Sequence, residues 1–388
     1  MPEDRSHDLV LFGATGFTGG LTARYLARHA PTDCRWAIAG RNRGKLEALR
    51  SQLAEINPKL AELPLLHADA NEPDSLRAVA VDTRAVVTTV GPYLRYGEPL
   101  VAACANAGTD YLDLTGEPEF VDLMYLRHHE KAQQTGARLI HACGFDSVPY
   151  DLGVLHTVQR LPEGVPLKLE SFVRVGAAFS GGTYRSAIGA LSRLREASRV
   201  AKQRRDVEGA PSHRRVARVK RGFHRTKHVR RWALPAPTID PQIVLRSAAA
   251  LPRYGPNFTY GHYLAMRLPA ALALAGGAGA LIAATQVRPV RSWLLERKQS
   301  GEGPSEERRA KSWFSVHIVG HGGGNHVVTK VSGGDPGYDE TSKILAESAL
   351  CLLYDDVPKT SGQVTTAAAM GNPLIERLRK AGIAFTDL

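Results

Sequence analysis

Three glycines stand at a constant spacing near the start of the chain, in the run GATGFTG of residues 13–19. An apolar run over residues 8–12 precedes them and an amphipathic stretch to about residue 29 follows, which predicts a strand, a tight turn and a helix. Glycine at such a turn lets a pyrophosphate lie against the backbone, where the N–H groups of the helix start bind it. The glycines alone leave an ordinary strand-to-helix turn as the alternative.

A second predicted strand, over residues 35–40, ends at Arg41, where a dinucleotide-binding fold contacts the adenosine ribose. Enzymes specific for NAD usually place Asp or Glu there, and its carboxylate repels a 2′-phosphate. Arg41, followed by Arg43 and Lys45, instead offers cations that suit the 2′-phosphate of NADP. The alternative is that all three are solvated loop residues.

These residues must be positioned by strands and helices that alternate up to about residue 150. Further strands are predicted over residues 63–70, 85–91 and 137–143, and a strand with its exit loop over residues 110–117. Helices are predicted over residues 45–56, 74–80, 98–107 and 118–134. The β-branched run at 85–91 is typical of a parallel strand buried on both faces. This alternation predicts an α/β fold with a Rossmann-type, doubly wound parallel sheet.

Several motifs resemble the saccharopine dehydrogenase-like superfamily, in particular its trans-acting enoyl reductase branch. They are residues 13–19, 39–41, 90–93, 111–117 and 144–153 in the first half, and 181–183, 333–338, 346–350 and 363–371 in the second. The resemblance therefore covers nearly the whole chain. It implies an NADP-binding domain, a second α+β domain with a mixed or antiparallel sheet, and reduction of an acyl double bond in the synthesis of complex bacterial lipids.

The chain has 388 residues, of which 43% are hydrophobic, and is long enough for two domains. We expect an NADP-binding domain over residues 1–150, a substrate domain over 151–340, and C-terminal helices over 341–388 that pack back on the first domain. In the second half, residues 165–178 predict a strand and residues 312–319 and 326–332 a hairpin. Helices are predicted over residues 340–354 and 373–380.

The glycine turn and the following strand ends are expected to bind NADP(H). The expected cofactor-binding residues are Gly13, Ala14, Thr15, Gly16, Phe17, Thr18, Gly19, Arg41, Asn42, Lys45, Asp69, Ala70, Val90, Gly91, Pro92, Tyr93 and Gly116.

In the enoyl reductase chemistry that the resemblance implies, hydride reaches the β-carbon, charge builds on the thioester oxygen, and an acid protonates the α-carbon. The candidate donors at strand ends are Tyr93, Asp146, Ser147 and Tyr150. Alternatively, Asp146 and Ser147 cap the helix that begins near Tyr150, and Tyr93 covers the cofactor. The substrate is expected to be an acyl thioester or lipid intermediate, presented by an acyl carrier or a polyketide synthase.

Two other functions remain open at this stage. An amino-acid dehydrogenase of the saccharopine type needs arginines that bind several carboxylates, for which Arg174 and Arg185 are candidates. A membrane- or lipid-associated protein that binds NADP(H) without turnover is the third hypothesis.

The net charge of +12 is concentrated in residues 193–231, which we call the basic block; it carries fifteen Lys or Arg against three carboxylates. A solvated loop is one interpretation and an anionic partner another, while the absence of a recognition motif argues against nucleic acid. Residues 268–285 carry no charge and predict a buried or groove-lining helix, a membrane-surface helix or a span. One hypothesis places both segments on a face that meets an anionic membrane or an acidic carrier.

The four cysteines, Cys34, Cys104, Cys143 and Cys351, lack metal-binding or disulfide spacing, so reduced thiols are expected, with Cys143 packed in its strand. No metal is expected, and His317, His321 and His326 are interpreted as structural. The first residues lack an apolar signal segment, so we expect a cytoplasmic location, with peripheral attachment to the inner face of the plasma membrane under the membrane hypothesis.

Overall fold

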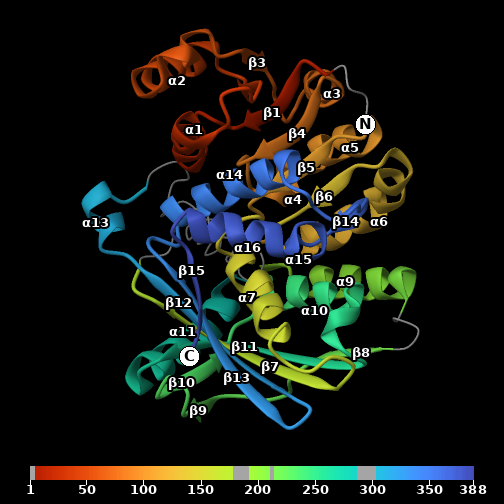
Figure 1. The fold of residues 1–388 in the computed structure, drawn as a ribbon, viewed down its shortest axis with the longest axis vertical. Coiled ribbons are helices and arrows are strands. Elements are labelled where there is room, and N and C mark those ends of the chain that lie inside the picture. The colour runs from red at the N-terminus through yellow and green to blue at the C-terminus, as the bar shows by residue number, and fades with distance from the viewer. Residues whose placement is uncertain (1–4, 178–191, 210–213, 286–302) are drawn as a thin grey trace.

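A seven-stranded parallel sheet forms the upper half of the molecule in Figure 1. The computed structural model describes residues 5–177, 192–209, 214–285 and 303–388. The strand order is β14-β6-β5-β4-β1-β2-β3, so the winding direction reverses between β1 and β4. This order confirms the predicted doubly wound sheet. Its strands are β1 (His7–Phe12), β2 (Trp36–Gly40), β3 (Leu65–His67), β4 (Thr83–Thr88), β5 (Asp110–Asp113), β6 (Arg138–Ile140) and β14 (Gly362–Val364).

Helices cover both faces of this sheet because alternate residues of its strands point to opposite sides. Leu9 and Leu11 of β1 share a core with one set of helices, and Val10 and Phe12 share a core with the other. The first set is α1 (Phe17–His29), α2 (Arg43–Ile56) and α14 (Asp339–Tyr354). The second set is α3 (Pro73–Val81), α5 (Glu98–Ala107) and α6 (Pro118–Thr135). The remaining helical turns of this half are α4 (Tyr93–Tyr96) and η1 (Pro58–Glu62).

Two differences from the expected strands matter for the site. β3 is shorter than predicted, and Asp69 lies beyond it in a turn where its carboxylate accepts from the Asn71 N–H at 2.9 Å. β14 was not predicted, because three residues are too short to show a strand pattern.

A second, mixed sheet forms the lower half in Figure 1. Its order is β15-β13-β12-β7-β11-β10-β9, with β8 also paired to β11. β11 runs parallel to β7 and β8 and antiparallel to β10. The strands are β7 (Leu167–Val175), β8 (Arg215–Arg218), β9 (His224–Thr226), β10 (Arg231–Pro235), β11 (Asn257–Met266), β12 (Phe314–Gly322), β13 (Asn325–Gly333) and β15 (Ala384–Asp387). The predicted hairpin is confirmed as β12 and β13.

The remaining helices connect or flank this sheet. They are α7 (Val148–Val158), α9 (Leu194–Glu208), α10 (Asp240–Ala250), η2 (Pro252–Tyr254), α11 (Leu268–Thr285), α13 (Glu306–Ala310), α15 (Thr366–Ala369) and α16 (Gly371–Lys380). The interpretation of the basic block as a solvated loop is wrong for most of its described part, which forms α9, β8, β9 and the start of β10. The motif at residues 181–183 and Arg185 lie outside the described residues.

One hydrophobic core runs from the first sheet into the second. It joins Leu9 of β1 and Ile344 of α14 to Tyr150 of α7 and Val316 of β12. Polar contacts reinforce this junction, since Ser342 Oγ of α14 donates to the carbonyl of Thr18 in α1 at 3.3 Å. The start of α1 is therefore held by residues from the far end of the chain.

Candidate active site

The glycine turn between β1 and α1 has the geometry that a phosphate cradle requires. Gly13 has φ +85°, and a Cβ built there would lie 2.6 Å from Val90 Cγ2. A Cβ at Gly19 would lie 2.2 Å from the Gly13 carbonyl oxygen, so the helix can approach the turn only with glycine at this position. The first N–H groups of α1 have no acceptor within the helix and are available to an anion. The turn fits a dinucleotide pyrophosphate.

Among the other residues of the turn, Thr15 and Gly16 are exposed at its tip and Ala14 is buried. The Phe17 side chain packs against Tyr338, with ring centroids 4.8 Å apart. Phe17 and Thr18 can therefore contribute main-chain N–H groups to a cofactor, while the Phe17 ring braces the helix start.

At the end of β2, the three predicted cations have different surroundings. Arg43 Nε donates to Glu47 Oε1 at 2.9 Å, and Lys45 N–H donates to the side chain of Asn42, the N-cap of α2. Arg41 is exposed immediately after the strand. Arg41 and Arg43 therefore differ in their contacts, because Arg43 already has a carboxylate partner.

The end of β4 supplies Val90, Gly91 and Pro92, of which the last two are exposed at the rim. Tyr93 is buried, and its hydroxyl donates to the Thr88 carbonyl and accepts from the Leu114 N–H, both at 3.2 Å. Tyr93 thus connects the end of β4 to the loop that follows β5 through hydrogen bonds. Its hydroxyl has main-chain partners on both sides, which favours a positioning role over proton donation.

Asp113, at the end of β5, organises the loops that leave β5 and β6. Its Oδ2 accepts from Tyr111 and His141 at 2.9 and 2.7 Å, and its Oδ1 accepts from the N–H groups of Thr115 and Ala142 at 3.0 and 2.9 Å. Ala142 has φ +59°, in the left-handed region that residues other than glycine seldom adopt. The carboxylate therefore stabilises an unfavourable backbone conformation where the chain turns towards Asp146.

Asp146 lies in this exit loop, between the two sheets. A Cβ built at Gly116 would lie 3.5 Å from Asp146 Oδ2, so the loops after β5 and β6 meet at this carboxyl group. Burial raises the pKa of Asp146 to about 6. The neighbouring Phe145 ring packs on Phe314 of β12, with centroids 4.9 Å apart. Asp146 is thus a carboxylic acid that retains its proton to higher pH than usual, at the ligand-binding edge of the sheet.

Ser147 and Tyr150 follow directly. Ser147 occupies the N-cap position of α7 without a side-chain capping bond; its hydroxyl donates to the Asp146 carbonyl at 2.6 Å. Tyr150 is buried with its ring against that of His262 at 4.9 Å. Burial and the nearby charges of Asp240 and Asp146 raise the pKa of Tyr150 far above its usual value, so its phenol keeps its proton.

Two residues of this cluster, Asp240 and His262, were missed by sequence reasoning. His262 Nε2 lies 3.4 Å from Asp240 Oδ2, and its Nδ1 lies 3.1 Å from the Tyr260 hydroxyl. Burial, followed by the charge of Arg218, lowers the pKa of His262 to about 3. Burial and the charge of Asp146 raise the pKa of Asp240 well above 3.8. His262 is consequently neutral near pH 7, and Asp240 retains its proton to higher pH than an ordinary carboxyl group.

The comparisons with known proteins agree with this geometry. Residues 9–140 match the saccharopine dehydrogenase NADP binding domain family. The trans-acting enoyl reductase of Mycobacterium leprae is 36% identical over 423 residues, covering 99% of this chain and 98% of that protein. A Mycobacterium tuberculosis protein provisionally named a trans-acting enoyl reductase is 38% identical over 420 residues, covering 98% of this chain and 97% of that protein. The chain belongs to the trans-acting enoyl reductase branch of the saccharopine dehydrogenase-like superfamily.

Membership of this branch makes the chain an NADP-dependent oxidoreductase, with NADP(H) as its cofactor. Among solved structures, apo saccharopine dehydrogenase (L-Glu forming) from Saccharomyces cerevisiae superimposes with a TM-score of 0.58 at 12% identity, covering 98% of this chain and all of that one. This likeness supports the shared fold of the superfamily.

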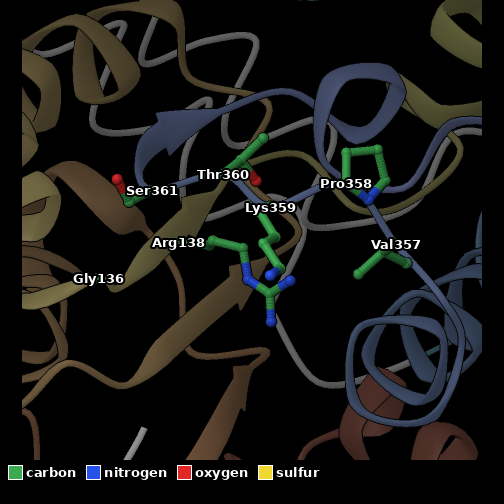
Figure 2. Close-up of a pocket in the computed structure, with 7 residues that line it drawn as sticks. All are labelled: Gly136, Arg138, Val357, Pro358, Lys359, Thr360 and Ser361. Carbon is green, nitrogen blue, oxygen red and sulfur yellow. The ribbon is translucent and has the colours of Figure 1, made fainter.

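A pocket of about 400 Å³ lies away from the site of this oxidoreductase (Figure 2). Arg138 and Lys359 point into it. Arg138 is the first residue of β6, and the other lining residues precede β6 or β14. It is therefore at the amino-terminal ends of these parallel strands, opposite the edge that carries Asp146. Arg138 Nε donates to Asp110 Oδ1 at 3.0 Å, so its guanidinium is part of a structural ion pair.

Metal and thiol chemistry find little support in the described ranges. Within residues 5–177, 192–209, 214–285 and 303–388, no three His, Cys, Asp or Glu side chains come together as metal ligands. Cys143 is buried, and burial followed by the charge of Asp113 raises the pKa of its thiol well above 9. A thiol that keeps its proton is a poor nucleophile.

Proposed function

We propose that the chain reduces the double bond of an α,β-unsaturated acyl thioester with NADPH, during the synthesis of complex lipids. The observation that carries this proposal is the Asp146 carboxyl group, which combines a pKa of about 6 with a place at the carboxyl edge of the parallel sheet. The substrate would be presented by an acyl carrier or a polyketide synthase. The names of the curated relatives support the reaction class.

The chain's residues divide the work as follows. NADPH, when bound, supplies the hydride that adds to the β-carbon. The glycine turn and Arg41 bind the phosphates. Tyr150, whose phenol stays protonated, donates a hydrogen bond to the thioester oxygen as negative charge develops there. Asp146 then delivers its proton to the α-carbon and becomes a carboxylate, which takes up a proton from solvent before the next turnover.

The amino-acid dehydrogenase alternative has less support. The Arg174 guanidinium lies over the Trp313 ring, 5.4 Å from its centroid, and Arg185 lies outside the described residues. An amino-acid substrate with several carboxylates needs converging guanidinium groups, and Arg174 is already engaged with an aromatic partner.

The assay follows NADPH oxidation by the purified chain with a trans-2-enoyl thioester, its saturated counterpart as control, and saccharopine with NADP+ in parallel. We expect oxidation of NADPH only with the unsaturated thioester, with one saturated thioester formed per NADPH consumed. Turnover with saccharopine or another amino acid alone would overturn the proposal. The place in lipid synthesis is tested by comparing the lipids of a deletion strain with those of the same strain carrying the restored gene.

A further inference from the structure

The edge of the second sheet formed by β9 and β10, together with the start of α11, carries cationic and apolar side chains side by side. Figure 1 shows these elements together, at the opposite end of the long axis from α2. We define the lipid face by its cations Arg225, Arg230, Arg231 and Arg267 and its apolar residues Phe223, Trp232, Leu268, Leu272 and Leu274. We propose that the lipid face binds the surface of an anionic phospholipid bilayer.

The apolar part of this face is exposed to an unusual degree for a helix without charge. Ala271 of α11 is buried, whereas residues 272–277 are all exposed, with Leu272 at 57% and Leu274 at 39%. The expectation of a buried helix is therefore wrong for these residues. Exposed leucines that lie close together are typical of a surface that binds a membrane or another protein. No helix in the described part of the chain is both long enough and apolar enough to cross a bilayer.

The cations of the lipid face surround a pocket of about 250 Å³. Its lining consists of Arg225, Arg230, Arg231, Trp232, Met266, Arg267 and Leu268. The Trp232 ring stacks on Phe223 with centroids 4.9 Å apart, which places an aromatic surface beside the guanidinium groups. Guanidinium groups bind phosphate strongly, and Trp is enriched at the membrane–water interface. A phospholipid headgroup matches this combination of charge and aromatic surface.

Charge complementarity selects an anionic surface. The sequence contains no carboxylate from Gly209 to Ile239 or from Pro241 to Thr285, so the strands and helix of this face bring no carboxylate of their own to neutralise its cations. Each Lys or Arg near an anionic leaflet adds attraction that salt screens. The leucines then contact the acyl chains once the arginines hold the protein at the surface.

Other arginines of the basic block do not belong to the lipid face and instead stabilise the fold. Arg193 is paired with Glu119 at 2.6 Å, and the buried Arg204 is paired with Glu208 at 3.0 Å. Arg214 donates to the carbonyl oxygens of Ala248, Leu251 and Gly255. Arg193, Arg204 and Arg214 are therefore unsuitable targets for a test of membrane binding, since their loss would destabilise the protein.

The test is flotation of the full chain with phosphatidylcholine vesicles, with and without phosphatidylglycerol, at low and high salt. We expect flotation with the anionic vesicles at low salt and its loss at high salt. The face variant is R225Q/R230Q/R231Q/R267Q. The control variant, R28Q/R50Q/K59Q/K131Q, removes the same charge from helices around the first sheet. The face variant should lose about a hundred-fold or more in partitioning, and the control variant should stay close to wild type.

A third variant, L272S/L274S, tests the apolar part and should weaken flotation without changing its salt dependence. Absence of flotation, equal losses in the face and control variants, or equal binding to neutral vesicles would each overturn the proposal. So would a dimer held together by this face, or binding of an acidic carrier protein in place of vesicles. The proposal goes beyond the reductase function, because vesicle binding requires no turnover and can succeed or fail independently of it.

Discussion

His262 Nε2, from the middle of β11, lies 3.4 Å from Oδ2 of Asp240 at the first turn of α10. Burial lowers the pKa of His262 to about 3, so the imidazole is neutral near pH 7, and burial raises the pKa of Asp240 well above 3.8. Asp240 Oδ1 is buried and has no hydrogen-bond partner among the described residues. This pair lies beside Tyr150, whose ring packs against that of His262 with centroids 4.9 Å apart.

The first prediction concerns Asp240→Asn. The folded protein keeps a proton on Asp240 that the unfolded chain releases above about pH 4. Wild type therefore loses stability as the pH rises from the unfolded towards the folded pKa. The variant should lack this loss, so its free energy of unfolding relative to wild type should increase with pH. Urea unfolding at pH 5 and pH 8 measures it. The exposed Asp33→Asn is the control, and a difference that does not vary with pH would contradict the prediction.

The second prediction concerns Asp146→Asn. Since a general acid must carry its proton, wild-type kcat/KM should fall about ten-fold per pH unit above the Asp146 pKa of about 6. The variant should lose roughly a hundred- to ten-thousand-fold in kcat, and its remaining activity should not show this dependence on pH. Its affinity for NADPH should be unchanged. Pre-steady-state and steady-state rates across pH measure both effects.

Tyr93→Phe is the comparison for that experiment. It removes two main-chain contacts of a buried hydroxyl and should lower stability by about 1–3 kcal/mol while leaving the pH profile of kcat/KM in place. If Asp146→Asn retained the wild-type dependence of kcat/KM on pH, proton donation by Asp146 would be excluded.

The third prediction concerns cofactor choice. Arg41→Ala should weaken NADPH binding by roughly ten- to a hundred-fold and leave NADH nearly unchanged, because charge-assisted hydrogen bonds to phosphate contribute about 1.5–3 kcal/mol. Arg43→Ala is the matched control, since Arg43 is paired with Glu47 and should affect both cofactors little. Titration of NADPH and NADH against the three proteins decides it. Equal losses for both cofactors in Arg41→Ala would mean that Arg41 does not bind the 2′-phosphate.

The fourth prediction concerns Gly19→Ala. The added methyl group would lie 2.2 Å from the Gly13 carbonyl oxygen, so α1 or the turn must shift. We expect a loss of about 1–3 kcal/mol in stability and a clear loss of NADPH affinity. Gly20→Ala adds a methyl group whose nearest neighbour is the flexible Arg24 side chain at 3.4 Å, and it should be tolerated. Urea unfolding and NADPH titration of the two variants should differ; equal behaviour would show that the close approach at Gly19 is unimportant.

The sequence by itself determined the elements whose signals are local. The glycine turn before α1, the helix over Asp339–Tyr354 and the hairpin of β12 and β13 follow from periodicity and turn residues within short segments. The same local order, strand followed by helix, is enough to predict the parallel sheet and the NADP-binding edge. Asp146 was found for this reason, because it follows a strand that the pattern identifies.

Only the tertiary structure decided which residues meet that edge. β14 joins the first sheet and β15 the second, although neither short segment carries a strand pattern. Asp240 and His262 come together behind Asp146, and Arg214 and Arg225 acquire different roles although both are arginines of the same basic block. The physical reason is that burial and pairing depend on contacts between residues far apart in the chain. Those contacts set the pKa of a carboxyl group and occupy or expose a guanidinium, whereas periodicity and turn signals reflect neighbouring residues alone.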